Sequence, residues 1–274
     1  MLLIALATAG SQSLEAQNPG GAPASGLVAH DETRIGSFIV VRWTAPDETV
    51  PDAFIKNHWY EHVTILKQGK PVLKLTTTEG IRYRIDENSG TDINGDGIPD
   101  LIIEEYTGGA HCCSSTVIYA VTGLAKPYFK VDTEHCSGRL KDLDHDGRME
   151  FITCDASFAY AYCPYADSPR PDVVYRYDLK QRTYVPDTPR FARYLTDIVS
   201  EIQGAETEMR KPVEDRAFGA CAVLQPVLDM IYRTGKFDAG LELFRRLYGN
   251  DDDFAEIQKS LIETIRASKH FAAR

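Results

Sequence analysis

The sequence lacks long apolar runs, an excess of basic residues and the common catalytic signatures. No stretch of about 18 apolar residues occurs in the 274-residue chain, which excludes a membrane-spanning helix. Lysine and arginine number 30 against 40 aspartates and glutamates, and the net charge of −10 argues against general nucleic-acid binding. The motifs G-x-S-x-G, H-E-x-x-H and G-x-x-x-x-G-K-[ST] are missing. The remaining composition is that of a globular protein able to hold cations.

The N-terminus favours export. Residues 1–10, MLLIALATAG, form a short apolar run followed by small residues, which is typical of a secretory signal peptide without its basic segment. A frayed apolar terminus is the alternative. We expect a signal-peptide-like segment at residues 1–16, a flexible lead-in rich in Gly, Pro and Ala at residues 17–35, and a secreted or periplasmic protein.

The cysteines agree with an oxidising compartment. They are even in number, and no C-x-x-C pair supports the intracellular alternative, a zinc site. All six are disulfide candidates: Cys112, Cys113, Cys136, Cys154, Cys163 and Cys221. The sequence leaves their connectivity open.

The residue pattern changes along the chain and predicts an α+β protein. Residues 36–188 contain short β-branched runs separated by Gly and Pro, which predict a β-rich domain. In residues 189–274 apolar residues recur at intervals of three and four, which predicts a helical region. The expected helices cover residues 191–202, 217–232, 239–247 and 254–265. Residues 228–250 loosely fit a tetratricopeptide-type helix pair, but stacked repeats of this kind need at least three copies, and a plain helical hairpin packed on the β domain is favoured.

Two acidic loops carry the strongest signal. The first acidic loop, residues 92–100, reads DINGDGIPD, and the second, residues 142–150, reads DLDHDGRME. Both match D-x-[DN]-x-D-G-x-x-[DE] and precede an apolar run. Calcium takes six to eight oxygen ligands, and positions 1, 3, 5 and 9 supply side-chain oxygens, while position 7 supplies its backbone carbonyl. The predicted Ca²⁺ ligands are Asp92, Asn94, Asp96, Ile98 and Asp100 in the first loop, and Asp142, Asp144, Asp146, Arg148 and Glu150 in the second.

Competing interpretations of these loops are weaker. An EF-hand needs a glutamate at position 12 between two helices, whereas Ile103 and Thr153 stand there in strand-like runs. Magnesium is disfavoured because it prefers to keep several waters. Turns that bind nothing remain the alternative, although carboxylates gathered in one loop would repel one another without a cation.

DINGDGIPDLII resembles the calcium loop of FG-GAP/VCBS repeats, the integrin-type β-propeller family, and DLDHDGRMEFI resembles a more divergent copy. The resemblance extends over residues 92–178. Between the two loops, the segment YTGGAHCCSSTVIYAV is similar to a stretch of secreted bacterial proteins of this repeat type whose function is undefined. The resemblance implies that each loop joins two strands of a blade and binds calcium, and that the protein recognises a protein or glycan partner. Residues 36–187 can supply about three blades, so we expect a partial or open propeller-like domain.

A second hypothesis is a secreted hydrolase. His111 stands beside Cys112 and Cys113, which resembles a Cys–His nucleophile pair. Oxidised cysteines would not act as nucleophiles, so a non-enzymatic module is favoured. The expected partner of this calcium-binding module is an unknown protein or glycan.

Overall fold

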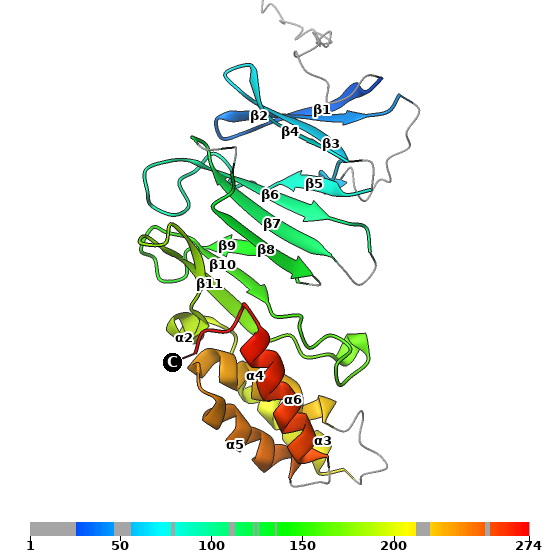
Figure 1. The fold of residues 1–274 in the computed structure, drawn as a ribbon, viewed down its shortest axis with the longest axis vertical. Coiled ribbons are helices and arrows are strands. Elements are labelled where there is room, and N and C mark those ends of the chain that lie inside the picture. The colour runs from blue at the N-terminus through cyan, green and yellow to red at the C-terminus, as the bar shows by residue number, and fades with distance from the viewer. Residues whose placement is uncertain are drawn as a thin grey trace, which may run out of the picture.

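The computed structural model describes residues 26–46, 56–77, 80–109, 113–122, 124, 126–134, 136–211, 220–249 and 253–273. Within these ranges three four-stranded antiparallel sheets follow one another, and the longer helices lie beyond the third sheet (Figure 1). In each sheet the strands lie side by side in chain order, as a meander. The prediction of a β-rich part followed by a helical region is therefore confirmed.

The strands divide evenly among the sheets. The first sheet holds β1 (Val28–Ile35), β2 (Phe38–Thr44), β3 (His62–Lys67) and β4 (Lys70–Thr76). The second holds β5 (Arg82–Ile85), β6 (Asp100–Tyr106), β7 (Ser114–Ala120) and β8 (Phe129–Glu134). The third holds β9 (Arg139–Lys141), β10 (Glu150–Cys154), β11 (Asp172–Asp178) and β12 (Thr183–Pro186).

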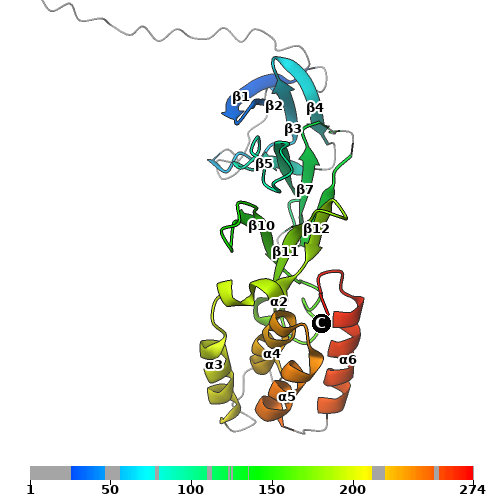
Figure 2. The ribbon, with the colours of Figure 1, turned by 90° about the vertical axis from the view of Figure 1, so that its left-hand side faces the viewer.

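The helices are mostly C-terminal. They are η1 (Tyr165–Asp167), α2 (Thr188–Phe191), η2 (Ala192–Tyr194), α3 (Val199–Met209), α4 (Cys221–Thr234), α5 (Phe237–Tyr248) and α6 (Phe254–Ala267). Figure 2 shows α3 to α6 grouped at the end of the molecule opposite the first sheet. None of the helices in the described ranges is long and apolar enough to cross a membrane.

The sheets pack face to face. In strand β6, residues 101–103 form a continuous apolar run because both faces of the strand are covered there. Leu101 and Ile103 share a core with the first sheet, whereas Ile102, which points to the opposite face, shares a core with Phe151 of the third sheet. The same core continues into the helices through residues such as Tyr232. The second sheet is thus enclosed between its two neighbours.

Disulfides strengthen the third sheet and its link to the helices. Cys136 and Cys154 are bonded, with Cα atoms 5.7 Å apart. Cys163, in the β10–β11 connection, is bonded to Cys221 at the start of α4, with Cα atoms 5.8 Å apart. Cys113 is disulfide-bonded as well, and Cys112 lies outside the described residues. The disulfide prediction is confirmed for the residues that the structure describes.

A buried polar network joins the third sheet to the C-terminal segment. The fully buried Asp155 carboxylate accepts hydrogen bonds from the Tyr232 hydroxyl at 2.5 Å, the Ser157 N–H at 2.9 Å and the Ser268 hydroxyl. Burial opposes ionisation, but these bonds outweigh it and lower the pKa of Asp155. Nearby, His270 Nδ1 lies 2.5 Å from the Tyr175 hydroxyl.

Two sequence-based boundaries were wrong. Residues 28–35, expected within the flexible lead-in, form β1; this strand pairs with β2, but most of its side chains are exposed, so it carries little apolar alternation. The helix expected over residues 191–202 is interrupted. Leu195 is extended after η2, and Asp197 accepts a hydrogen bond from the Val199 N–H at 3.0 Å, which starts α3 separately.

Candidate metal sites in two acidic loops

The two acidic loops occupy equivalent places. The first joins β5 to β6 and the second joins β9 to β10, so each connects the first two strands of a meander. The second residue of each loop, Ile93 or Leu143, is buried in a core. The corresponding connection in the first sheet is the short turn at Gly36 and Ser37, which carries no acidic residue.

Backbone hydrogen bonds curl the first acidic loop around Asp92. Its carboxylate accepts from the N–H groups of Gly95 at 2.8 Å, Asp96 at 3.2 Å and Gly97 at 2.8 Å. Gly97 has a φ of +85°, in the region that favours glycine. The Asn94 side-chain oxygen accepts from the Asp96 N–H at 2.9 Å. These hydrogen bonds hold residues 92–97 in one tight curve around the Asp92 and Asn94 oxygens.

Asp100 is the last residue of the first loop, and its carboxylate is only partly hydrogen-bonded. Its side chain is fully buried, and Oδ2 accepts from the Ile93 N–H at 3.0 Å. Oδ1 has no hydrogen-bond partner within the described part of the chain. Burial raises the pKa of Asp100 to about 7, against hydrogen bonds from the Ile93 N–H and the Tyr128 hydroxyl that lower it; the Asp96 and Asp92 carboxylates add a smaller upward contribution. A cation beside Oδ1 would relieve this cost.

The second acidic loop repeats the arrangement. The Asp142 carboxylate accepts from the N–H groups of Asp146 at 3.2 Å and Gly147 at 3.1 Å. Glu150 is buried, and its Oε2 accepts from the Leu143 N–H at 2.8 Å, as Asp100 does in the first loop. Burial is the main cause that raises the pKa of Glu150 to about 7. The ninth position thus has the same role in both loops.

Three carboxylates of the second loop converge. Asp142, Asp144 and Asp146 each offer one oxygen, and these oxygens lie within 4.8 Å of one another. Asp144 Oδ1 is buried without a hydrogen-bond partner among the described residues. Arginines lie close by: Arg190 Nη2 is 3.2 Å from Asp144 Oδ2, and Arg148 Nη1 is 3.8 Å from Asp146 Oδ2.

Neither Arg190 nor the aromatic residues around the two loops were predicted as site residues. The Tyr128 hydroxyl, which precedes β8, accepts from the Asn94 side-chain amide at 3.3 Å. Tyr184 of β12 donates to the Met149 carbonyl at 3.0 Å. No local signal marks these residues, because they lie about 30 to 50 positions from their partners in sequence.

The two loops also touch each other. The Met149 N–H donates to the Ile93 carbonyl at 2.8 Å. The Arg148 side chain packs against Gly95, where an added Cβ would lie 3.0 Å from its Nε. The first loop belongs to the second sheet and the second loop to the third, so this contact lies where those two sheets meet. Ordering either loop would therefore stabilise the contact between the second and third sheets.

The donor set fits a hard cation such as calcium. All side-chain candidates are carboxylate or amide oxygens, and one buried oxygen in each loop lacks a partner among the described residues. Ile98 and Arg148 stand where a backbone carbonyl is required, with their N–H groups each 2.9 Å from an acidic side chain. Their carbonyl role stays a prediction. His111, named in the hydrolase hypothesis, lies outside the described residues.

Comparisons with known proteins give two uncharacterised or broadly described relatives. An uncharacterized protein, y4bJ, of Sinorhizobium fredii is 34% identical over 135 residues, which cover 44% of this chain and 20% of that protein. A probable thylakoid lumen protein of Synechocystis is 24% identical over 201 residues, which cover 72% of this chain and 58% of that protein. The chain therefore spans less than two thirds of either relative. No family model and no solved structure matches.

Proposed function

We propose that this chain is a calcium-binding module, related to FG-GAP/VCBS repeats, whose two acidic loops hold structural Ca²⁺. The observation that carries the proposal is Asp100 Oδ1, a buried carboxylate oxygen without a partner in the described ranges, in a loop whose Asp96 and Asp92 charges help to raise the pKa of Asp100. Calcium would supply the positive charge that these carboxylates lack. It also takes six to eight oxygen ligands, which matches the number of oxygens that the loop offers. Asp92, Asn94, Asp96 and Asp100 would hold one ion, and the corresponding residues of the second loop the other.

The proposed architecture is a partial, open propeller-like domain. Three meanders packed face to face support it, because each has the strand order of one blade. In this proposal the C-terminal helices cover the third sheet where a fourth blade would otherwise begin. Calcium would hold the first two strands of a blade against the next element of the stack.

The proposed location is outside the cytoplasm, either secreted or periplasmic. Two described disulfides support it, since such bonds persist in oxidising compartments. The similarity to a probable thylakoid lumen protein adds weak support. In this setting the module would serve recognition of a protein or glycan partner, with calcium keeping the recognising surface rigid.

The two sites should differ in affinity. Asp144 and Asp146 already face arginines, at 3.2 and 3.8 Å, whereas the Asp92 and Asp96 side chains have no described ion pair. Calcium in the second loop would compete with these arginines for the Asp144 and Asp146 carboxylates. We therefore propose that the first loop binds more tightly, and that both fall near the range of about 10⁻⁴–10⁻³ M typical of extracellular modules.

Calorimetric titration of the disulfide-intact protein tests the proposal. We expect two calcium ions per chain and no comparable heat from magnesium. Asp96→Ala should remove the tighter site and Asp146→Ala the weaker one, each leaving the other in place. Asp132→Ala, at an exposed strand position, is the matched control and should leave both sites unchanged. Absence of calcium heat up to millimolar concentrations, in protein shown to be metal-free by elemental analysis, would refute the proposal.

A further inference from the structure

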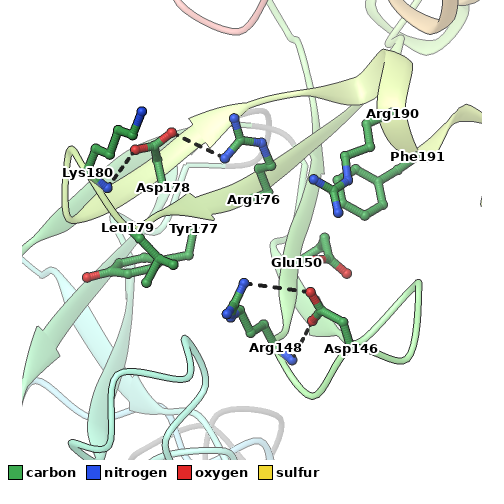
Figure 3. Close-up of a pocket in the computed structure, with 10 residues that line it drawn as sticks. All are labelled: Asp146, Arg148, Glu150, Arg176, Tyr177, Asp178, Leu179, Lys180, Arg190 and Phe191. Atoms are coloured by element: carbon green, nitrogen blue, oxygen red, sulfur yellow. Dashed lines mark hydrogen bonds and ion pairs between the residues drawn. The ribbon is translucent and has the colours of Figure 1, made fainter.

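A pocket opens directly beside the second acidic loop. Its volume is about 270 Å³, and it is lined by that loop, by the β11–β12 hairpin and by α2 (Figure 3). Asp146 and Glu150, two of the proposed calcium ligands, form part of its wall. An ion in the second loop would therefore lie next to whatever fills the pocket.

Basic side chains from separate elements line this pocket. Arg148 comes from the loop, Arg176 and Lys180 from the hairpin, and Arg190 from α2. Three acidic residues, Asp146, Glu150 and Asp178, line the same pocket. Leu179, which is 56% exposed, adds an apolar wall. The pocket thus combines donors for an oxyanion with a surface for an uncharged body.

The arginines of the pocket are held in two different ways. Arg176 is 2.7 Å from Asp187 and 3.3 Å from Asp178, and neither carboxylate belongs to an acidic loop. Arg190 and Arg148 instead face Asp144 and Asp146 of the second loop. Calcium in that loop would compete for these two carboxylates, and the guanidinium N–H groups of Arg148 and Arg190 would then be available to another acceptor.

We propose that this pocket binds a carboxylate-bearing ligand in a calcium-dependent manner, with Arg148 and Arg190 as the recognising residues. The inference rests on the proposed function, because it requires calcium in the second loop. A planar guanidinium matches the two oxygens of a carboxylate, and carboxylates are the groups that these two arginines already face. Without calcium, the loop carboxylates occupy the arginines and repel the ligand.

Titration of the full, oxidised chain with galacturonate tests the proposal, with galactose as the uncharged counterpart. We expect saturable binding of galacturonate in millimolar calcium, and at least tenfold weaker binding in EGTA or in magnesium. N-acetylaspartate, tested in parallel, distinguishes a sugar acid from a peptide-type carboxylate as the source of the ligand. Binding of neither acid in calcium would overturn the proposal, and so would equal binding in EGTA.

Substitutions of Arg148 and Arg190 test whether these two arginines form the binding site. Arg148→Gln and Arg190→Gln should each weaken binding of the acid at least tenfold, whereas Arg210→Gln, at a residue 79% exposed and remote from the pocket, should not. Arg190→Gln should also tighten calcium binding to the second loop several-fold, because Asp144 loses its competing partner. Unchanged calcium and acid affinities in both pocket variants would overturn the proposal. Normal calcium titration without acid binding would do so while leaving the proposed function intact.

Discussion

Replacement of Asp100 by asparagine should have effects of opposite sign with and without calcium. Asparagine keeps the acceptor for the Ile93 N–H, which lies 3.0 Å from Oδ2, but removes the charge. Its amide group would replace Oδ1, the oxygen without a partner in the described ranges, and would remove the repulsion with the Asp92 and Asp96 carboxylates. In EGTA the variant should therefore be more stable than the parent, whereas it should lack the stabilisation that calcium provides.

The size of the effect follows from the pKa of Asp100. Burial raises it from 3.8 to about 7, so the ionised side chain costs about 4 kcal/mol at most near pH 8. We expect a gain of about 2 kcal/mol, because the asparagine amide must also be desolvated. For a chain of this length that corresponds to a rise in Tm of about 4–8 °C. With calcium at ten times its Kd, the parent gains about 1.4 kcal/mol per site, and the variant should lose this gain at the first loop.

Calorimetric melting in EGTA and in calcium measures both effects. Asp86→Asn is the matched control, because Asp86 directly follows β5, shortly before the loop, and accepts from the Asn88 N–H at 2.8 Å. It should shift Tm equally in both buffers. The reasoning would be refuted if Asp100→Asn lowered Tm in EGTA, or if it kept the full calcium-dependent rise of the parent.

Three further perturbations test the junction between the third sheet and the helices. Tyr232→Phe removes one hydrogen bond from the buried Asp155 carboxylate, so urea unfolding should show a loss of about 1.5–3 kcal/mol. Burial lowers the pKa of His270 below its ordinary value of 6.5, so the unfolded chain binds a proton more readily than the folded one. The free energy of unfolding should therefore fall as pH drops below about 6.5, by at most about 1.4 kcal/mol per pH unit. His270→Gln should make this dependence on pH shallower. Cys221→Ser removes the bond to Cys163, which closes a separation of 58 residues, and should cost about 2–4 kcal/mol in thermal or urea unfolding.

Contrary results would be equally informative. A Tyr232→Phe effect no larger than that of Tyr194→Phe, at a partly exposed position, would mean that the buried bond contributes little. An unchanged slope between pH 5 and 6.5 in His270→Gln would show that other groups set the acid sensitivity. Full stability in Cys221→Ser would mean that non-covalent packing alone fastens α4.

The sequence predicted the parts of this fold that depend on local patterns. The apolar runs after each acidic loop became β6 and β10, and residues 239–247 and 254–265 fall within α5 and α6. The spacing within the loops also predicted their tight curl. In these places the residues that determine the structure are near neighbours in the chain.

Features that depend on distant contacts were missed. Strand β1 is held by its pairing with β2, although its side chains are mostly exposed. The contact of Arg190 with Asp144 joins residues 46 positions apart, and Tyr184 reaches back to Met149. Such contacts arise from the stacking order of the sheets, which no short pattern encodes.

The most direct test of calcium as a structural ion is thermal melting of the oxidised protein in excess EGTA, in millimolar calcium and in millimolar magnesium. The account predicts a rise in Tm that only calcium produces. The rise should be smaller in Asp96→Ala and in Asp146→Ala, and absent when both substitutions are combined. An identical Tm in all three buffers, from protein that elemental analysis shows to be free of metal, would contradict the account.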